Sequence, residues 1–261
     1  MTLLSACAPA PSGAPAETTS PTFVSLNPCL DAILVEIAEP DQILAISHYS
    51  HQPGGSRMER GVALSFASTG GTAEEIIALE PDIVLASVFL PPSTKSALER
   101  AGLRIEAFGS PTTLDESDAQ IERMAALVGS GEPGTAVRGP EIDTASGPTP
   151  SVLLWQAGQI VAGQETLIAQ LIKEAGFTSH SEALGLGQAD YVTLEQVLAD
   201  PPDLLLVAGD SAGQQHPSLA KLEDTRVHFF DPSLFYCGGP SVVDARAELA
   251  ALRASFEEGT E

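Results

Sequence analysis

The feature that most constrains this chain is a short unit that occurs twice. "EEIIALEPDIVL" runs from Glu74 to Leu85 and "EQVLADPPDLLL" from Glu195 to Leu206, aligned without a gap at an offset of 195 − 74 = 121 residues. Each copy combines a short apolar helix pattern, a Pro-Asp break and a run of branched apolar residues that is typical of a buried strand. The repeat therefore predicts two similar α/β halves in one chain.

Strand and helix patterns alternate on both sides of this repeat. The first half has predicted strands at 23–26, 41–47, 83–87 and 103–108, and predicted helices at 30–38, 72–79, 94–101 and 114–128. The second half has predicted strands at 151–155, 204–208 and 227–230, and predicted helices at 165–175, 194–199 and 242–256. Such alternation predicts an α/β fold of two Rossmann-like lobes with mostly parallel sheets. Ligands of open α/β sheets bind beyond the carboxyl ends of the strands, so a ligand cleft is expected between the lobes.

The expected organisation has four parts. Residues 1–21 are interpreted as a lipoprotein signal remnant and flexible tether, 22–113 as the N-terminal lobe, 114–149 as a connecting helix and linker, and 150–256 as the C-terminal lobe. Gly139 and Pro140 interrupt the connecting segment, with Gly147 beyond them. Since proline disrupts a helix interior, we expect a helix over 114–128 and at most a short, broken continuation.

The N-terminal segment carries a localisation signal. "LSAC", ending at Cys7, resembles a bacterial lipobox, in which the cysteine is acylated, and a Pro/Ala/Thr/Ser tract follows it. The basic and long apolar regions of a signal peptide are missing, so a chance run of small residues is the alternative. Acylation at Cys7 would make this a protein tethered to a membrane and located outside the cytoplasm.

Composition narrows the function classes. The chain has 261 residues and a net charge of −23, with 12 basic against 35 acidic residues. This balance disfavours nucleic acid and anionic membrane surfaces as partners. The sequence contains no P-loop and no H-E-x-x-H motif, so we expect no enzyme activity. A cysteine nucleophile in "CGGP" is the enzymatic alternative.

The order of several segments resembles a known family. These segments are "FVSLNPCLDAIL", "ILAISHYS", "STGGTAEEIIALEPDIVLAS", "VLLWQAGQIVAGQETLIAQLIKEAG", "YVTLEQVLADPPDLLLVAG" and "DPSLFYCGGPSVVDARAEL". Together they resemble the periplasmic substrate-binding proteins of the vitamin B12 and iron-siderophore group, which serve ABC importers and have two lobes joined by a helical backbone. The resemblance implies a monomeric binding protein that captures a corrinoid or ferric siderophore and delivers it to a permease dimer. A haem- or metal-binding protein of the same fold, or a scavenger or adaptor without a transporter, is the alternative.

The resemblance also gives the repeated glutamates a role. In this family each lobe presents a glutamate at the start of such a helix, and the pair contacts arginines of the two permease subunits. These positions correspond to Glu74 and Glu195. Carboxylates in a first helical turn are favoured by the helix dipole and pair well with guanidinium groups. Two ordinary first-turn glutamates are the alternative.

Candidate ligand-binding residues lie where predicted strands end. Aromatic side chains there offer large apolar faces with polar groups, which suits a flat ligand such as a corrin. Few Lys or Arg residues fall in these segments, which favours a corrinoid over an anionic siderophore. The candidates are Asn27, Pro28, Cys29, His48, Tyr49, His51, Arg57, Phe89, Trp155, Phe235, Tyr236 and Cys237. Trp155 could equally be a core residue.

Two further questions concern metals and thiols. "HYSH" places His48 and His51 three residues apart and could bind a metal, but solvent-exposed or ligand-stacking histidines are the simpler reading. We expect no resident cofactor, although the ligand itself can contain cobalt or iron. If Cys7 is acylated, Cys29 and Cys237 remain either as a disulfide or as two free residues at the ligand site.

Overall fold

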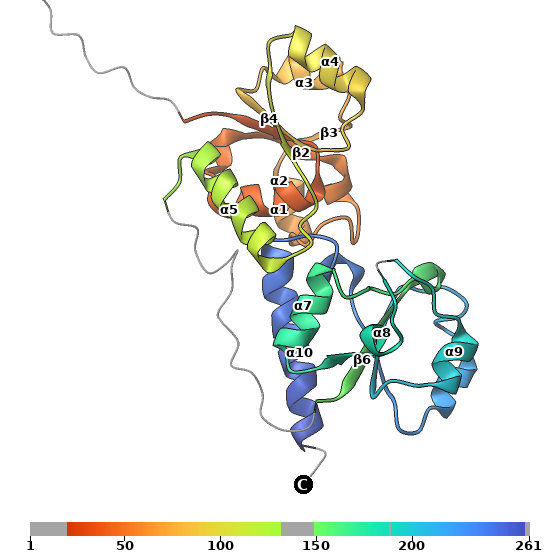
Figure 1. Ribbon diagram of the computed structural model, residues 1–261. Coiled ribbons are helices and arrows are strands. Elements are labelled where there is room, and N and C mark those ends of the chain that lie inside the picture. The colour runs from red at the N-terminus through yellow and green to blue at the C-terminus, as the bar shows by residue number, and fades with distance from the viewer. Residues whose placement is uncertain (1–19, 132–148, 188, 259–261) are drawn as a thin grey trace, which may run out of the picture.

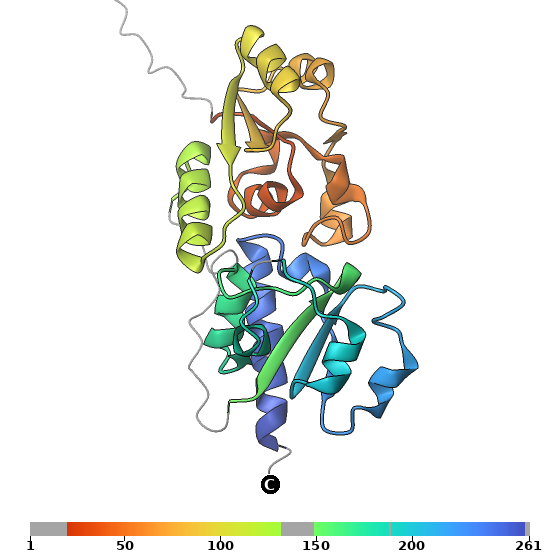
Figure 2. The same ribbon diagram turned by 45° about the vertical axis from the view of Figure 1, so that its right-hand side comes forward.

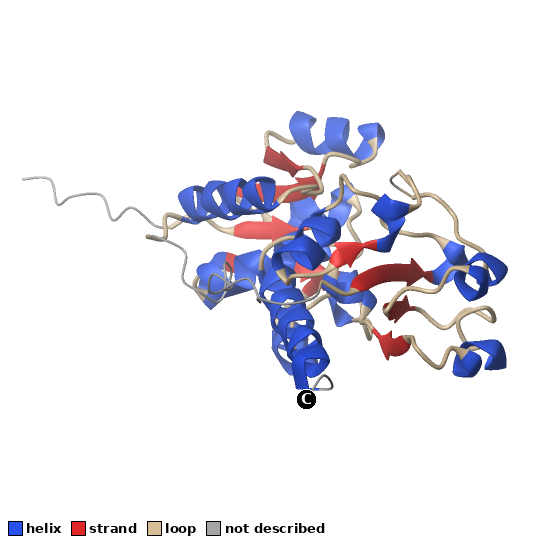
Figure 3. Cartoon of the chain, turned by 60° about the horizontal axis from the view of Figure 1, so that its bottom comes forward, coloured by secondary structure: helices blue, strands red, loops and turns tan. Residues whose placement is uncertain are grey.

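The computed structural model describes residues 20–131, 149–187 and 189–258, and it consists of two α/β lobes stacked one above the other (Figure 1). Each lobe is built on a wholly parallel sheet, in the order β3-β2-β1-β4-β5 for the first and β7-β6-β8-β9 for the second. Helices flank the strands (Figure 3). The predicted fold class is confirmed.

The elements of the first lobe follow the predicted programme with small shifts at their ends. Its strands are β1 (Phe23–Ser25), β2 (Ile43–Ser47), β3 (Ser68–Thr69), β4 (Ile83–Ser87) and β5 (Arg104–Phe108). Its helices are α1 (Pro28–Ile37), α2 (Arg60–Ser65), α3 (Ala73–Leu79), α4 (Pro92–Arg100) and α5 (Leu114–Val128), with 3-10 turns η1 (Pro40–Gln42) and η2 (His48–His51).

The second lobe repeats this arrangement with a smaller sheet. Its strands are β6 (Ser151–Gln156), β7 (Thr178–Ser179), β8 (Leu204–Ala208) and β9 (Arg226–Phe229). Its helices are α7 (Leu167–Glu174), α8 (His180–Ala183), α9 (Leu194–Ala199) and α10 (Pro240–Glu258), with 3-10 turns η3 (Ala157–Gln159), η4 (Pro217–Lys221) and η5 (Pro232–Leu234).

The Pro-Asp of the repeated unit has the same structural task in both lobes. Asp82 accepts hydrogen bonds from the backbone N–H and hydroxyl of Thr22, at 2.8 and 2.9 Å, beside the start of β1. Asp203 accepts the same pair from Ser151, at 2.7 and 2.8 Å, at the start of β6. Each aspartate thereby fixes the turn between helix and strand to the beginning of the central strand.

Each sheet separates two hydrophobic layers. In the first lobe, α1 and α5 cover one face with Ile33 and Met124, and the opposite face packs against Ile76 of α3 and Leu98 of α4. In the second lobe, α7 and α10 cover one face, and residues from α9 and η4 help to cover the other. Because both faces are buried, the strands read as continuous apolar runs.

The predicted connecting helix is α5, and it belongs to the first lobe. Ile121, Met124 and Val128 share a core with Phe23, and the helix ends at Gly129 in the left-handed region, with φ 78°. Any continuation through Gly139, Pro140 and Gly147 lies outside the described residues. The long helix that runs from the lobe interface along the second lobe is α10 (Figures 1 and 2).

Within the described residues, no helix combines the length and the apolarity needed to cross a membrane.

Candidate functional site

The carboxyl ends of the two sheets face each other across the junction between the lobes (Figure 2). The strand register shows which positions of the two lobes correspond. Phe23 of β1 pairs with Ile83, and Val152 of β6 pairs with Leu204. Because Ile83 and Leu204 are separated by the repeat offset, 204 − 83 = 121, Phe23 corresponds to Val152. Counting forward along both strands makes Asn27 the counterpart of Gln156. An amide side chain therefore lies at the carboxyl end of β1 in lobe 1 and of β6 in lobe 2.

The larger of two pockets at this junction has a volume of about 290 Å³. Lobe 1 contributes the loop between β5 and α5, and lobe 2 contributes the end of β6, the segment after it, the start of α7 and the loop before α10. Its lining consists of Ser110, Pro111, Thr112, Gln156, Ile160, Val161, Ala162, Thr166, Leu167, Ile168, Ala189, Phe235 and Tyr236. We call this the large pocket.

A smaller pocket adjoins the large one and shares Ser110, Pro111 and Tyr236 with it. The rest of its lining comes from lobe 1: Asn27, Cys29, Leu30, Ser87, Phe108, Gly109 and Gln120. The two pockets together are called the cleft below. Among the described residues, none with a charged side chain lines either pocket, although the chain as a whole carries a net charge of −23.

Tyr236 is one of three residues that line both pockets of the cleft. It contributes to both pockets and is 60% exposed, and its hydroxyl donates a hydrogen bond to Gln156 Oε1 at 3.3 Å. Partial burial raises the pKa of the Tyr236 phenol, so this group is a neutral donor and acceptor at neutral pH. The adjacent ring of Phe235, 4.3 Å away between centroids, is buried in the core of lobe 2 and supports it.

Lobe 1 presents its aromatic side chains at the ends of β2 and β4. Phe89 is 81% exposed and Tyr49 is 52% exposed. Tyr49 lies against the ring of His48 at 4.1 Å between centroids, and His48 Nδ1 donates to the Thr69 carbonyl at 3.2 Å. His51 is partly buried in the same 3-10 turn. These side chains lie at the correct edge of the sheet but outside the lining of the two pockets.

Two expectations about ligand contacts are wrong. Trp155 is fully buried in the core of lobe 2, where its indole Nε1 donates to the Val192 carbonyl at 2.8 Å. The side chain points into the layer beneath the strand, because β6 continues through Gln156 before it reaches the cleft.

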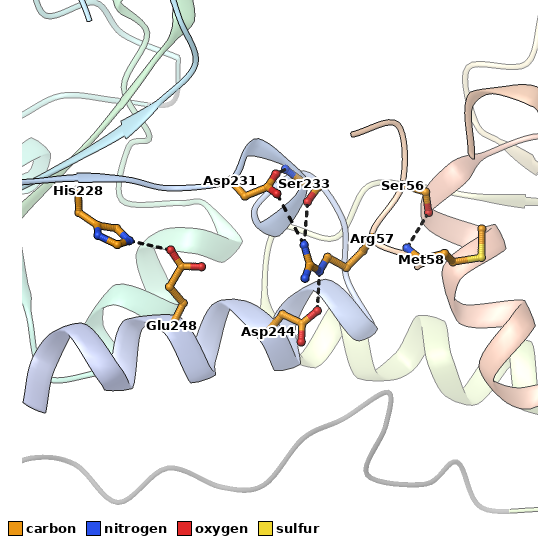
Figure 4. Close-up of polar contacts among 8 residues, drawn as sticks. All are labelled: Ser56, Arg57, Met58, His228, Asp231, Ser233, Asp244 and Glu248. Atoms are coloured by element: carbon orange, nitrogen blue, oxygen red, sulfur yellow. Dashed lines mark hydrogen bonds and ion pairs between the residues drawn. The ribbon is translucent and has the colours of Figure 1, made fainter. Parts of the chain in front are cut away.

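Arg57 is also engaged elsewhere. Its Nε donates to Asp244 Oδ2 at 2.6 Å, and its guanidinium lies 3.7 Å from Asp231 and 3.5 Å from the Ser233 hydroxyl (Figure 4). All three partners belong to lobe 2, so Arg57 is an interlobe contact and not a cation offered to a ligand.

Of the two alternatives for the cysteines, the structure has the bridge. Cys29 and Cys237 form a disulfide with a Cα–Cα distance of 5.3 Å, joining α1 of lobe 1 to the loop before α10 of lobe 2. Cys29 still lines the smaller pocket. Pro28, its neighbour in the chain, is not part of that lining, and the Pro28 carbonyl accepts a hydrogen bond from the Ser56 hydroxyl. Cys7 lies outside the described residues.

Glu74 and Glu195 occupy equivalent exposed positions. Each is the second residue of its helix, in α3 and α9, and each follows a threonine N-cap, Thr72 or Thr193. The pKa of Glu195 lies below its usual value because backbone N–H and Thr193 hydroxyl hydrogen bonds favour the carboxylate. Each lobe thus presents one acidic side chain at a helix N-terminus.

Sequence reasoning missed part of the lining. Ser110, Thr112, Gln156 and Ile160 carry no distinctive chemistry, and "SPTT" reads only as a turn. The repeat offset of 121 does not reveal Gln156, which lies 156 − 27 = 129 residues after Asn27; only the strand register of the structure aligns the two. Within the described residues no cluster of three or more His, Cys, Asp or Glu side chains could hold a metal ion.

Comparison with known proteins agrees with this geometry. Residues 23–137 match the family model described as "Periplasmic binding protein". Two curated cobalamin-binding proteins, from two strains of Halobacterium salinarum, are 27% identical over 206 residues, covering 72% of this chain and 54% of theirs. The chain thus spans about half the length of these relatives.

Solved structures share the fold throughout. A periplasmic haem-binding protein from Pseudomonas aeruginosa matches 90% of this chain and 92% of its own at 21% identity, with a TM-score of 0.65. The periplasmic vitamin B12-binding protein of Vibrio cholerae matches 90% and 97% at 19% identity and 0.61. The periplasmic haem-binding protein of the same organism matches 88% and 98% at 16% identity and 0.69. The resemblance expected from the sequence is confirmed.

Proposed function

We propose that this chain, which has the fold of periplasmic binding proteins, is the extracytoplasmic substrate-binding lipoprotein of an ABC importer and captures a corrinoid. The observation that carries the proposal is the cleft at the carboxyl edge of both sheets, with an uncharged lining to which Tyr236 contributes in both pockets. Binding and delivery of a ligand require no catalytic group.

The chemistry of the lining favours a corrinoid. A corrin ring is large, flat and rimmed by neutral amides, which can stack on Tyr236 and bond to Gln156 and Asn27. Ferric siderophores are often anionic, and an anion would meet no cation in the described lining. The two relatives named as cobalamin-binding proteins support the same choice.

Haem is the second candidate, and one observation favours it. The rings of His48 and Tyr49 are in tilted contact, and the Tyr49 phenol is left half exposed at the cleft-facing end of lobe 1. A phenol or imidazole can bind haem iron directly. If the Tyr49 phenol binds the iron, the haem complex should have a charge-transfer absorption band that Tyr49→Phe abolishes.

A calorimetric screen of the purified protein tests the ligand class. Cyanocobalamin, haem and a ferric catecholate siderophore are compared, and we expect cyanocobalamin to bind most tightly. Tyr236→Ala should weaken that binding at least tenfold, since burying an aromatic side chain at a binding site is worth about 1.5–3 kcal/mol. Val227→Ala, an exposed apolar residue on β9, is the control and should leave affinity unchanged. Tightest binding of the siderophore would refute the corrinoid assignment.

Glu74 and Glu195 are proposed to contact cations on the two permease subunits. The support is their equivalent position at the second residue of α3 and α9, one in each lobe. Glu74→Lys with Glu195→Lys should abolish uptake and leave ligand affinity unchanged. Asp115→Lys is a matched control because Asp115 is also the second residue of a threonine-capped helix, α5. Uptake that survives the double reversal would refute the docking role of these two glutamates.

We also propose that Cys7 carries a lipid anchor in an oxidising compartment. The disulfide between Cys29 and Cys237 supports the compartment, since such bonds persist outside the reducing cytosol. Labelled fatty acid should enter the wild-type protein and not Cys7→Ser. Equal labelling of both proteins would remove the anchor from the proposal.

A further inference from the structure

The interlobe disulfide lies at the base of the cleft. Cys29 is in the first turn of α1 and lines the small pocket, and Cys237 directly follows Tyr236, which lines both pockets. Both cysteines are partly exposed. A bond that joins the lobes therefore lies within one residue of the side chain that faces the ligand.

The disulfide belongs to a small junction whose other contacts are non-covalent. Gly239 N–H donates to the Ser117 hydroxyl at 3.0 Å, and a Cβ at Gly239 would lie only 2.6 Å from Ile33 Cγ1. Arg57 binds Asp244 and Asp231 nearby. Loss of the disulfide would leave these contacts in place, so the lobes would remain together but be less restrained.

The two sulfur atoms are not chemically equivalent. Cys29 is the second residue of a ten-residue helix, and its own N–H is held by Asn27 Oδ1 at 2.8 Å. Thiolates are stabilised at helix N-termini, whereas Cys237 lies in a loop. Cys29 is therefore the better leaving group when an incoming thiolate attacks Cys237.

We propose that the bridge between Cys29 and Cys237 is a thiol–disulfide exchange site for a dithiol reductant, and that its reduction loosens the lobes and speeds ligand release. A thiolate of the dithiol attacks Cys237 Sγ, the S–S bond breaks, and Cys29 leaves as a thiolate. The second thiol of the reductant then closes its own disulfide and releases Cys237. Two electrons pass from the dithiol to the protein, and the protons that the dithiol loses balance those that the cysteines take up.

The coupling between the lobes is tested without any ligand. Full-length protein carrying Cys7→Ser, so that only the pair reports thiols, is compared with the same protein carrying Cys29→Ser and Cys237→Ser. Hydrogen exchange at 110–117 and 235–240 should become at least tenfold faster in the serine variant, with unchanged exchange in β4 and β8. Equal exchange at the junction in the two proteins would overturn the proposal.

The identity of the reductant is read from two arms. Oxidised protein is treated with dithiothreitol, or with a thioredoxin-type protein dithiol at the same concentration, and free thiols are titrated. Two free thiols per chain should appear with at least one of the two reagents. Faster appearance of these thiols with the protein dithiol than with dithiothreitol identifies a protein partner. Resistance of the bridge to both reagents in the native protein would refute exchange.

The effect on the ligand rests on the proposed function, and cyanocobalamin serves as the probe. Cyanocobalamin should dissociate about tenfold faster from the serine variant. By linkage, bound cyanocobalamin should change the equilibrium constant for reduction of the disulfide by the same factor by which reduction changes the affinity for cyanocobalamin. Asp203→Ala, a change in lobe 2 away from the junction, controls for general destabilisation. Equal dissociation rates would overturn the coupling, whereas failure of cyanocobalamin to bind either form, with faster exchange at the junction, would overturn only the ligand.

Discussion

The two lobes agree at one end of their sheets and differ at the other. At the amino ends, Asp82 and Asp203 make the same pair of hydrogen bonds to Thr22 and Ser151. At the carboxyl ends, Asn27 uses its side chain to cap α1, whereas Gln156 accepts a hydrogen bond from Tyr236. The shared end holds the fold together, and the divergent end is where a ligand can be recognised.

The difference also extends into the layers beneath the cleft. Leu26 in lobe 1, which is only partly buried, corresponds by register to the fully buried Trp155 in lobe 2. Beneath the cleft, lobe 2 is therefore stabilised by one large buried side chain, that of Trp155. At the same level lobe 1 has the smaller Leu26, followed by the Asn27 cap of α1. The predictions below test this contrast, beginning with the largest effect.

Trp155→Ala should destabilise the protein by about 5 kcal/mol. Removal of a buried tryptophan costs about 3–5 kcal/mol, and the Val192 carbonyl also loses its donor. Leu26→Ala should cost less than half of this. Urea denaturation followed by circular dichroism measures both. Similar losses at the two positions would show that the lobes depend equally on them.

Asp31→Asn should remove a pH dependence that belongs to lobe 1 alone. Burial raises the pKa of Asp31 from 3.8 to about 7, although hydrogen bonds from Ser25, Ser50 and Ser47 oppose this. Because the folded state holds the proton more tightly, Asp31 favours folding below pH 4, and this contribution is lost as the pH rises through 7. At about 1.4 kcal/mol per pKa unit, the loss is on the order of 4 kcal/mol.

The measurement compares the unfolding free energies of wild type and Asp31→Asn at pH 5 and pH 8.5. The wild type should lose stability relative to the variant as the pH rises. A constant difference between the two proteins would mean that Asp31 does not titrate in this range.

Asp82→Ala and Asp203→Ala should each lower the free energy of unfolding by about 1–2 kcal/mol. Each removes hydrogen bonds between an exposed helix–strand turn and the start of the central strand. Chemical denaturation of the two variants side by side is the test. Since the geometry is the same in both lobes, the losses should agree within about 0.5 kcal/mol. A clearly larger loss in one lobe would show that the equivalence is only geometric.

Tyr236→Phe should have the smallest effect on stability, within about 0.5 kcal/mol, since its hydrogen bond to Gln156 is exposed. Thermal unfolding measures this change. A loss above 2 kcal/mol would place Tyr236 among the residues that hold the lobes together and not among those that face the ligand.

The sequence predicted the long elements because their periodicity is strong and the repeat duplicates it. The two-residue strands β3 and β7 and the four-residue helix α8 were missed, since so few residues cannot express a period. Thr72 caps α3, but Glu75, three residues later, bonds to Thr69 and Gly70 and does not complete a capping box.

The site was harder to predict for two physical reasons. "SVLLWQ" is buried on both faces, so no alternation indicates where Trp155 points or which residue reaches the cleft. Arg57 forms its ion pair with Asp244, which lies 244 − 57 = 187 residues later in the sequence. Local sequence patterns carry no information about pairs with so large a separation. The edge of the sheet could be predicted, but the partners across it could not.

The disulfide also sets a problem for the unfolded chain. Its cysteines are separated by 208 residues, whereas Cys7 and Cys29 are separated by only 29 − 7 = 22. Loop-closure entropy favours the short pairing by about 2 kcal/mol, or roughly thirtyfold, before the lobes form. Acylation of Cys7 would remove this competitor. A lipid attached early in biogenesis would then act as a protecting group that leaves Cys29 free until Cys237 has folded into reach.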